Sequence, residues 1–261
     1  MCAGRDKAAT HAVAQRLGAE PVVLDLGDIA GVRSTAAQLP AVDAVVCNAG
    51  VQVLRGLSFT PDGFEETFQI NHLAHLALLD VLFSRPEPPR QAVLIGSATH
   101  DPAINTGTPN PPDDDDPTSL ARPEPDTDGA LKAGLRRYAT SKLLAAAMTP
   151  ALAREYPAAH FTCFDPGLMA GTGLARQFPP AVRVLWNTVF KAASILPFAS
   201  TPTASARAMA TVLCEQPPPA ASGAYVDHRL RVVPPSARAR DVAYQDLVLH
   251  HSRDLLAGIR G

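Results

Sequence analysis

The sequence predicts a single α/β domain, built as a doubly wound parallel sheet with helices on both faces. Short, β-branched and almost continuously apolar runs alternate with helical patterns, and the connections between them are short. Nearly continuous apolar runs are typical of strands that are buried on both faces. The chain has 261 residues, 46% of them hydrophobic, which is enough for one sizeable core. No repeat or linker divides residues 1–261, so we expect one domain.

Five stretches are expected to form strands, and a sixth, at the start of the chain, is expected to be the end of one. Met1–Gly4 consists of small residues typical of a strand end. The five apolar runs that predict strands are Pro21–Leu26, Val42–Gly50, Gln91–Ser97, His160–Gly167 and Gly223–Asp227.

The helices are predicted from apolar residues at helical spacing. Pro150 lies inside one of these patterns and is expected to bend that helix or to end it early. The predicted helices are Lys7–Leu17, Gly63–Phe83, Arg137–Glu155 and Ala181–Leu196.

Two stretches interrupt the alternation. Residues 101–129 are rich in Pro, Asp and Thr, and they predict a long surface loop whose run of aspartates is solvated rather than a cation site. Residues 173–200 contain the amphipathic pattern of Ala181–Leu196. We expect this helix region to pack on the domain, with a flap over an apolar substrate as the alternative and membrane contact as a third reading.

Charge and cysteine content exclude several partner classes. A net charge of −2 gives no electrostatic reason to expect nucleic acid or an anionic membrane as a partner. The four cysteines lack metal-site spacing, which favours reduced core thiols in a cytoplasmic protein. We expect no stable membrane insertion, because no targeting segment precedes Arg5 and no uncharged run is long enough to span a bilayer.

The candidate site follows from where the strands end. Ligands of open parallel sheets bind beyond the carboxyl ends of the strands, and the stretches LDL, CNAG, GSATH and DPG place small or polar residues there. The stretch YATSK places Tyr138 and Lys142 four residues apart, on one face of a helix. Lowering a tyrosine pKa from about 10 to about 7 takes about 4 kcal/mol. An ammonium about 4 Å away supplies about that much, so this pair beside a serine hydroxyl can protonate a carbonyl oxygen while hydride arrives at carbon.

The motifs NAG, INHLAHLALL, GSATH, YATSK and DPG occur in this order, and the chain resembles the short-chain dehydrogenase/reductase family over essentially its whole length. The resemblance implies a Rossmann-like fold and a catalytic tetrad. Tyr138 would be the proton donor and acceptor, and Ser97 would orient the substrate oxygen. Lys142 would hold the nicotinamide ribose and lower the Tyr138 pKa, and Asn71 would fix a water in the proton relay.

The resemblance also implies a cofactor site for NADP(H). Arg5 would meet the adenosine 2′-phosphate, and Asp25 and Leu26 would lie by the adenine. Besides Tyr138 and Lys142, the residues implied to line the rest of the cofactor are Asn48, Ala49, Gly50, Pro166, Gly167 and Thr172.

Three histidines near the tetrad have simpler explanations. His72 and His75 could form a metal pair, but no third ligand is implied, and we expect ordinary helix positions and no metal site. His100 is expected to be a polar loop residue, with substrate contact as the alternative.

Within the family, the sequence is similar to the retinol dehydrogenase and protochlorophyllide reductase branch. Two residues depart from that branch. Leu144 stands where the protochlorophyllide enzymes carry a cysteine, so light-driven pigment reduction is not expected. Gly171 stands where the branch has threonine, which is why Thr172 is the expected contact to the cofactor amide.

Family members carry a strand, a glycine-rich turn and a helix before the position of Arg5, together about 25 to 30 residues. We expect a start codon called too far downstream, with a real truncation as the alternative. The expected function is NADP(H)-dependent interconversion of an alcohol and a carbonyl on an apolar small molecule, in a protein that could be a homodimer or homotetramer. The alternative is a catalytically weak or inactive binding protein of the same fold.

Overall fold

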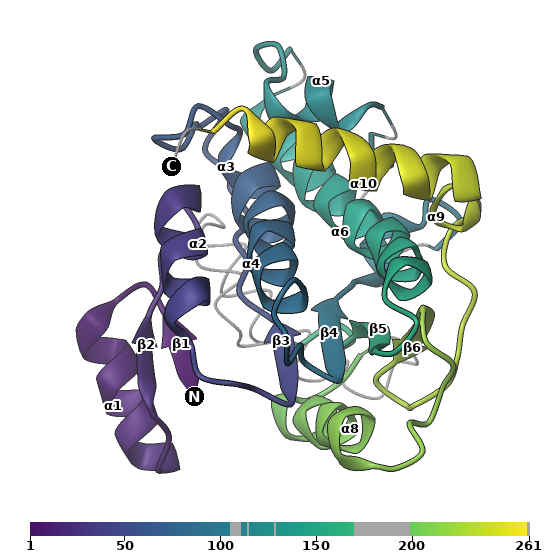
Figure 1. Ribbon diagram of the computed structural model, residues 1–261. Coiled ribbons are helices and arrows are strands. Elements are labelled where there is room, and N and C mark those ends of the chain that lie inside the picture. The colour runs from purple at the N-terminus through teal and green to yellow at the C-terminus, as the bar shows by residue number, and fades with distance from the viewer. Residues whose placement is uncertain (105–110, 114, 128, 170–198, 260–261) are drawn as a thin grey trace.

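The computed structural model describes residues 1–104, 111–113, 115–127, 129–169 and 199–259, and it has the predicted α/β architecture (Figure 1). Every strand pair is parallel. β1 and β2 form a two-stranded sheet, and the other strands form a four-stranded sheet in the order β3-β4-β5-β6. The strands are β1 (Cys2–Gly4), β2 (Pro21–Val23), β3 (Ala44–Cys47), β4 (Gln91–Ile95), β5 (His160–Asp165) and β6 (Ala224–Asp227).

Each apolar run contains a strand, and most of the strands end before the polar residues that close the run. This leaves the predicted site residues in the turns that follow β2, β3, β4 and β5. The helical elements of the described residues are α1 (Lys7–Leu17), α2 (Ile29–Gln38), α3 (Glu66–Phe68), the π-helical η1 (Gln69–Leu73), α4 (Ala74–Phe83), the 3-10 turn η2 (Ala98–His100), α5 (Pro117–Ala121), α6 (Ala130–Glu155), α8 (Pro202–Cys214), α9 (Ala237–Arg240) and α10 (Val242–Ala257).

Side-chain caps explain several helix starts, including three that the apolar spacing did not predict. Asp28, Thr201 and Asp241 accept hydrogen bonds from the backbone N–H groups of the first turns of α2, α8 and α10. Helix α1 has the predicted bounds, because Asp6 caps its start and Gly18 closes it in the left-handed conformation with φ 62°.

Pro150 does not end α6 early, so this part of the prediction is wrong. The helix continues to Glu155 although proline has no N–H to donate within it. The following turn carries Ala151 and Leu152, which are buried in the main core. Burial of these side chains offsets the lost hydrogen bond.

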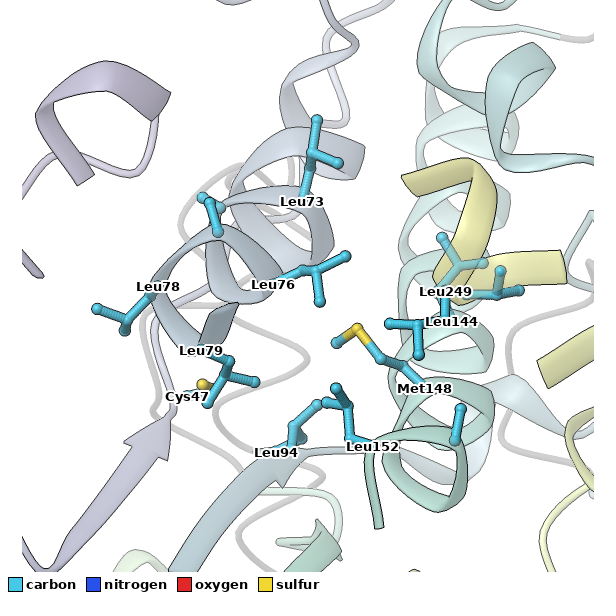
Figure 2. Close-up of a cluster of buried hydrophobic side chains, with 14 of the residues drawn as sticks. Cys47, Leu73, Leu76, Leu78, Leu79, Leu94, Leu144, Met148, Leu152 and Leu249 are labelled. Atoms are coloured by element: carbon cyan, nitrogen blue, oxygen red, sulfur yellow. The ribbon is translucent and has the colours of Figure 1, made fainter. Parts of the chain in front are cut away.

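The main core lies between the four-stranded sheet and the helices on one of its faces. Figure 2 shows Leu76 and Leu79 from α4 pointing toward Met148 and Leu152 from α6, with Leu94 of β4 beside Leu152. On the opposite face α8 packs against the sheet, and a smaller cluster forms there (Figure 1). The members of this cluster are Val93, Phe164, Ala208, Val212 and Val226. Helices therefore cover both faces, as the doubly wound prediction requires.

The hydrogen-bonded sheet is interrupted between β1 and β3. Figure 1 shows the β1–β2 pair with α1 to one side of the four-stranded sheet. Val23 of β2 and Val46 of β3 are apolar strand residues that remain exposed. The described residues supply no strand between the two sheets, and the interruption lies where the family resemblance implies one. That a further strand belongs there stays a prediction.

Part of the predicted surface loop is ordered against the domain. Residues 117–121 form α5, and Pro117 and Ala121 are buried, which corrects the expectation of a loop throughout residues 101–129. Two of the aspartates also bind the protein rather than only solvent. Asp113 pairs with Arg136 at 3.1 Å, and Asp116 pairs with His251 at 2.9 Å.

The cysteines are free thiols, and two of them lie in the core. Burial raises the pKa of Cys47 and of Cys163 to about 12. Cys214 is exposed, so the expectation of core thiols does not hold for it. In the described part of the chain, none of the helices combines the length and apolar character needed to cross a membrane.

We expect the protein to lose stability as the pH falls from about 6.5 toward 4, because two buried histidines are neutral in the fold. Burial, with a smaller contribution from the charge of His75, lowers the pKa of His72 to about 3. Burial, with a contribution from Lys142, lowers the pKa of His75 to about 4. In this window the unfolded chain binds more protons than the folded one, so each imidazole costs about 1.4 kcal/mol per pH unit.

Urea unfolding at a series of pH values measures this loss. His72→Gln is expected to flatten the dependence of the unfolding free energy on pH. His250→Gln is the matched control, because the His250 side chain is 75% exposed. An unchanged slope in His72→Gln would contradict the assignment.

Candidate active site

Three of the predicted catalytic side chains meet at the carboxyl ends of β4 and β5. Ser97 follows β4, and Tyr138 and Lys142 lie on one face of α6. Tyr138 and Ser97 share a side-chain hydrogen bond. Lys142 is 6% exposed, and its ammonium donates to the Ile95 carbonyl oxygen at 3.0 Å and lies 5.4 Å from the centre of the Tyr138 ring. The hydroxyl groups of Ser97 and Tyr138 and the buried ammonium of Lys142 therefore lie close together.

The electrostatics of Tyr138 differ from the sequence-based expectation. Burial raises the pKa of Tyr138, the Asp165 carboxylate raises it further, and the hydrogen bond with Ser97 lowers it by less. Burial also lowers the pKa of Lys142 to about 8, against the opposing effects of Cys163 and Asp165. In this structure the Tyr138 pKa is therefore raised and not lowered as expected, because desolvation of the phenol and the Asp165 carboxylate outweigh the hydrogen bond with Ser97.

Asn71, in the π-helical turn η1, connects two other segments of the site by hydrogen bonds. Its Oδ1 accepts from the Val51 N–H at 2.7 Å, and its Nδ2 donates to the Val51 carbonyl oxygen at 2.9 Å. The same Nδ2 donates to Ser141 Oγ at 3.0 Å, and Ser141 Oγ donates to the Tyr138 carbonyl oxygen at 2.7 Å. The amide thus ties the turn after β3 to the helix that carries Tyr138. Because its two N–H groups are used in this way, the implied role in holding a relay water stays a prediction.

The residues implied for the cofactor follow the same edge of the sheet. Arg5 after β1 and Asp25 after β2 are exposed, and Asp25 Oδ1 accepts from the Gly27 N–H at 2.9 Å. Asn48, Ala49 and Gly50 follow β3 and are exposed. All of these turns lie at carboxyl ends of parallel strands, where a ligand of such a sheet binds.

The turn after β5 needs a glycine. Gly167 has φ 73°, and a Cβ there would lie 2.8 Å from His228 Nδ1 and 3.0 Å from Ser200 Cβ. The preceding Pro166 is half-buried. This turn keeps bare backbone beside the tetrad.

Two of the residues implied for the cofactor stand apart from this group. The Leu26 side chain is buried in the main core, and its carbonyl oxygen accepts from Gln69 Nε2 at 3.3 Å, so its side chain does not face a ligand. Thr172 lies outside the described residues, as do the expected helix Ala181–Leu196 and most of residues 173–200.

Sequence reasoning missed Asp165, Ser141 and Tyr225. Asp165 is 8% exposed, and it accepts from the Gly167 N–H at 2.9 Å and from the Tyr225 hydroxyl at 3.1 Å. An acidic residue at the end of the otherwise apolar run HFTCF was the available signal for Asp165. Tyr225 and Ser141 had no signal, because their roles depend on partners distant in the sequence.

His100 is a buried residue of the turn η2, and the alternative of substrate contact stays a prediction. It is 1% exposed, with Nδ1 2.7 Å from the Ser97 carbonyl oxygen, and Nε2 accepts from the Ser236 N–H at 3.1 Å. Since Nε2 accepts, Nδ1 carries the proton and donates to Ser97, which fixes a neutral tautomer. Burial also lowers the pKa of His100. The expectation of a polar loop position is wrong, because the His100 side chain is buried.

Comparisons with known proteins agree with the fold and with the motifs. No family model matches the chain. The chain is 31% identical over 202 residues to protochlorophyllide reductase B of Oryza sativa subsp. japonica, an alignment that covers 68% of this chain and 50% of that protein. It is 29% identical over 194 residues to the short-chain dehydrogenase iccH of Talaromyces variabilis, covering 58% and 53%. The chain thus spans about half the length of these curated relatives.

Solved structures extend the likeness in fold. One is the NADPH-bound carbonyl reductase from chicken fatty liver, with a TM-score of 0.54 and 15% identity, covering 88% of this chain and 85% of that one. At this identity the likeness concerns the fold alone.

Proposed function

Because the chain belongs to the short-chain dehydrogenase/reductase family, we propose that it is an NADP(H)-dependent oxidoreductase. Its reaction interconverts an alcohol and a carbonyl on an apolar small molecule, with Tyr138 as proton donor and acceptor. The observation that carries the proposal is the meeting of Ser97, Tyr138 and Lys142 at the carboxyl ends of β4 and β5. A cytoplasmic location is part of the proposal, and the net charge of −2 supports a small-molecule substrate over nucleic acid.

The residues present fit a dinucleotide. The exposed guanidinium of Arg5 offers a phosphate contact, and the buried ammonium of Lys142 offers a donor for a ribose hydroxyl. The Gly167 turn would contribute backbone contacts, because His228 and Ser200 fill the space that a Cβ at this position would need. Asn48, Ala49, Gly50 and Asp25 would complete the contacts along the edge of the sheet.

The bound cofactor would supply hydride to the carbonyl carbon, and the chain's own residues would handle the proton. Tyr138 would donate its hydroxyl proton to the carbonyl oxygen, which Ser97 would hold by a hydrogen bond. The raised pKa of Tyr138 keeps it a neutral phenol near neutral pH, which is the form that donates. Lys142, with a pKa of about 8, remains largely charged there and would stabilise the negative charge that develops on the phenol oxygen.

Consumption of NADPH by the purified protein, followed by nicotinamide absorbance with a series of aliphatic and aromatic ketones and aldehydes, tests the proposal. Transfer of deuterium from labelled NADPH to the carbonyl carbon of the product is the expected result. A folded protein that binds NADPH without turning over any of these carbonyls would favour the second candidate, an inactive binding protein. The interruption of the sheet between β1 and β3 is the observation that favours this candidate.

Light-driven reduction of a chlorophyll precursor is not part of the proposal, although the named relatives include protochlorophyllide reductases. Leu144 is fully buried among the core leucines of α6, at the position where those enzymes carry cysteine. An apolar core side chain there supplies no transferable proton.

Arg5→Ala is expected to weaken NADPH binding by about tenfold to a hundredfold, because an arginine–phosphate contact contributes about 1.5–3 kcal/mol. NADH binding should change little, since NADH lacks the 2′-phosphate. Calorimetric titration with both cofactors measures the difference. Arg16→Ala, which alters an exposed arginine in the last turn of α1, is the matched control. Equal losses for NADPH and NADH would show that Arg5 has only a structural role.

A further inference from the structure

Tyr225 lies where three segments of the candidate site meet. Its hydroxyl donates to Asp165 Oδ2 at 3.1 Å, and its ring centre lies 4.9 Å from that of His100. A Cβ at Gly96 would lie 2.8 Å from Tyr225 Cε2 and 3.2 Å from its hydroxyl oxygen. The tyrosine is 4% exposed, so it fills the space that the missing side chain of Gly96 leaves open directly before Ser97.

Asp165 connects this tyrosine to the turn after β5. One carboxylate oxygen accepts from the Tyr225 hydroxyl, and the other accepts from the Gly167 N–H at 2.9 Å. Asp165 is 8% exposed, and a charge-assisted hydrogen bond is strong in such a buried position. The carboxylate also raises the pKa of Tyr138 and opposes the lowering of the Lys142 pKa by burial, so its charge reaches the tetrad.

His100 connects the same tyrosine to Ser97. Its imidazole donates to the Ser97 carbonyl oxygen at 2.7 Å and accepts from the Ser236 N–H at 3.1 Å, which fixes the ring on both sides. The Tyr225 ring packs against it. The position of Tyr225 thus bears on Ser97 by two routes, through contact with Gly96 and through His100.

We propose that Asp165 and Tyr225 are positioning residues, which lock the Ser97 turn after β4 to the Gly167 turn after β5 and so hold Ser97 against Tyr138. The inference rests on the proposed function, because it assigns these residues to the geometry of that reaction. A fraction of an ångström of freedom between the two turns would move the hydroxyl that orients the carbonyl oxygen, and reacting geometry is sensitive to such shifts.

The test compares variants that remove single atoms. Tyr225→Phe keeps the ring against His100 and Gly96 but removes the hydroxyl. Asp165→Asn keeps the size but leaves one acceptor oxygen for two donors. Each is expected to lower kcat for carbonyl reduction by about tenfold to a hundredfold, with KM for NADPH changed by less than about twofold. The double variant should lose no more than the larger single loss, because the two residues act through one contact.

Hydrogen exchange of the protein without cofactor or substrate provides a readout that needs no turnover. Exchange in the segments 96–100 and 165–168 is expected to become faster in both single variants. Tyr156→Phe is the matched control: it removes a hydroxyl at the end of α6, where the ring packs on Phe83 and Phe161, and it should change neither readout. Gly96→Ala reaches the same contact from the other side, since its Cβ would collide with Tyr225 and Cys163 Sγ, and it should give the same kcat loss.

The possible outcomes distinguish a failure of the positioning role from a failure of the proposed function. Faster local exchange with a lower kcat and an unchanged KM supports the positioning role. Faster exchange with unchanged kcat, or unchanged exchange in both variants, overturns it. A wild-type protein without turnover removes the proposed function and the catalytic purpose of the lock with it. Exchange would then decide only whether the lock itself exists.

Discussion

Tyr138→Phe is expected to lower kcat for carbonyl reduction by about 10²–10⁴-fold, the range that a positioned general acid contributes. Phenylalanine keeps the ring 5.4 Å from the Lys142 ammonium but removes the only proton that the site can transfer from this position. It also removes the hydrogen bond with Ser97. Because the ring remains, the Kd for NADPH should change by less than about twofold.

Steady-state kinetics and calorimetric titration with NADPH measure these two effects. Tyr156→Phe again serves as the control, because Tyr156 directly follows the same helix and lies among aromatic core side chains. Turnover near the wild-type rate in Tyr138→Phe would overturn the assignment of the tetrad.

Lys142→Ala is expected to damage both turnover and cofactor affinity. The ammonium is buried, donates to the Ile95 carbonyl oxygen at 3.0 Å and lies within the electrostatic reach of Asp165. Its loss removes the cation that would stabilise charge on the Tyr138 oxygen, at a cost of about 10²–10³-fold in kcat. The Kd for NADPH should rise by about tenfold, because a hydrogen bond from a charged donor to the ribose is lost.

The exposed Lys132 near the start of α6 offers the matched control, and Lys132→Ala should leave both quantities unchanged. Urea unfolding of Lys142→Ala checks that the variant folds. A lower kcat with an unchanged Kd for NADPH would remove the ribose contact from the assignment and leave only the electrostatic one.

Much of the fold could be predicted because it depends on local patterns. The apolar runs predicted β2 to β6, and the capped stretch Lys7–Leu17 with its helical apolar spacing predicted α1. Helices α2, α8 and α10 were missed, although Asp28, Thr201 and Asp241 cap them. The buried residues of the last two helices recur at helical spacing, such as Ala208 and Val212 in α8 and Val248 and Ser252 in α10, so a local signal was present in both stretches.

The candidate site, too, could be predicted from the sequence only in part. By itself the sequence determined an α/β protein in which small and polar motifs follow the ends of the strands. Because ligands bind at the carboxyl ends of parallel strands, it also predicted that Ser97, Tyr138 and Lys142 lie in one site. Only the tertiary structure decided that burial raises the Tyr138 pKa, that Asn71 braces Val51 and Ser141, and that Asp165 meets Tyr225. Each of these depends on desolvation or on a contact between segments far apart in the chain. Such effects arise when strands and helices pack, and spacing along the sequence does not encode them.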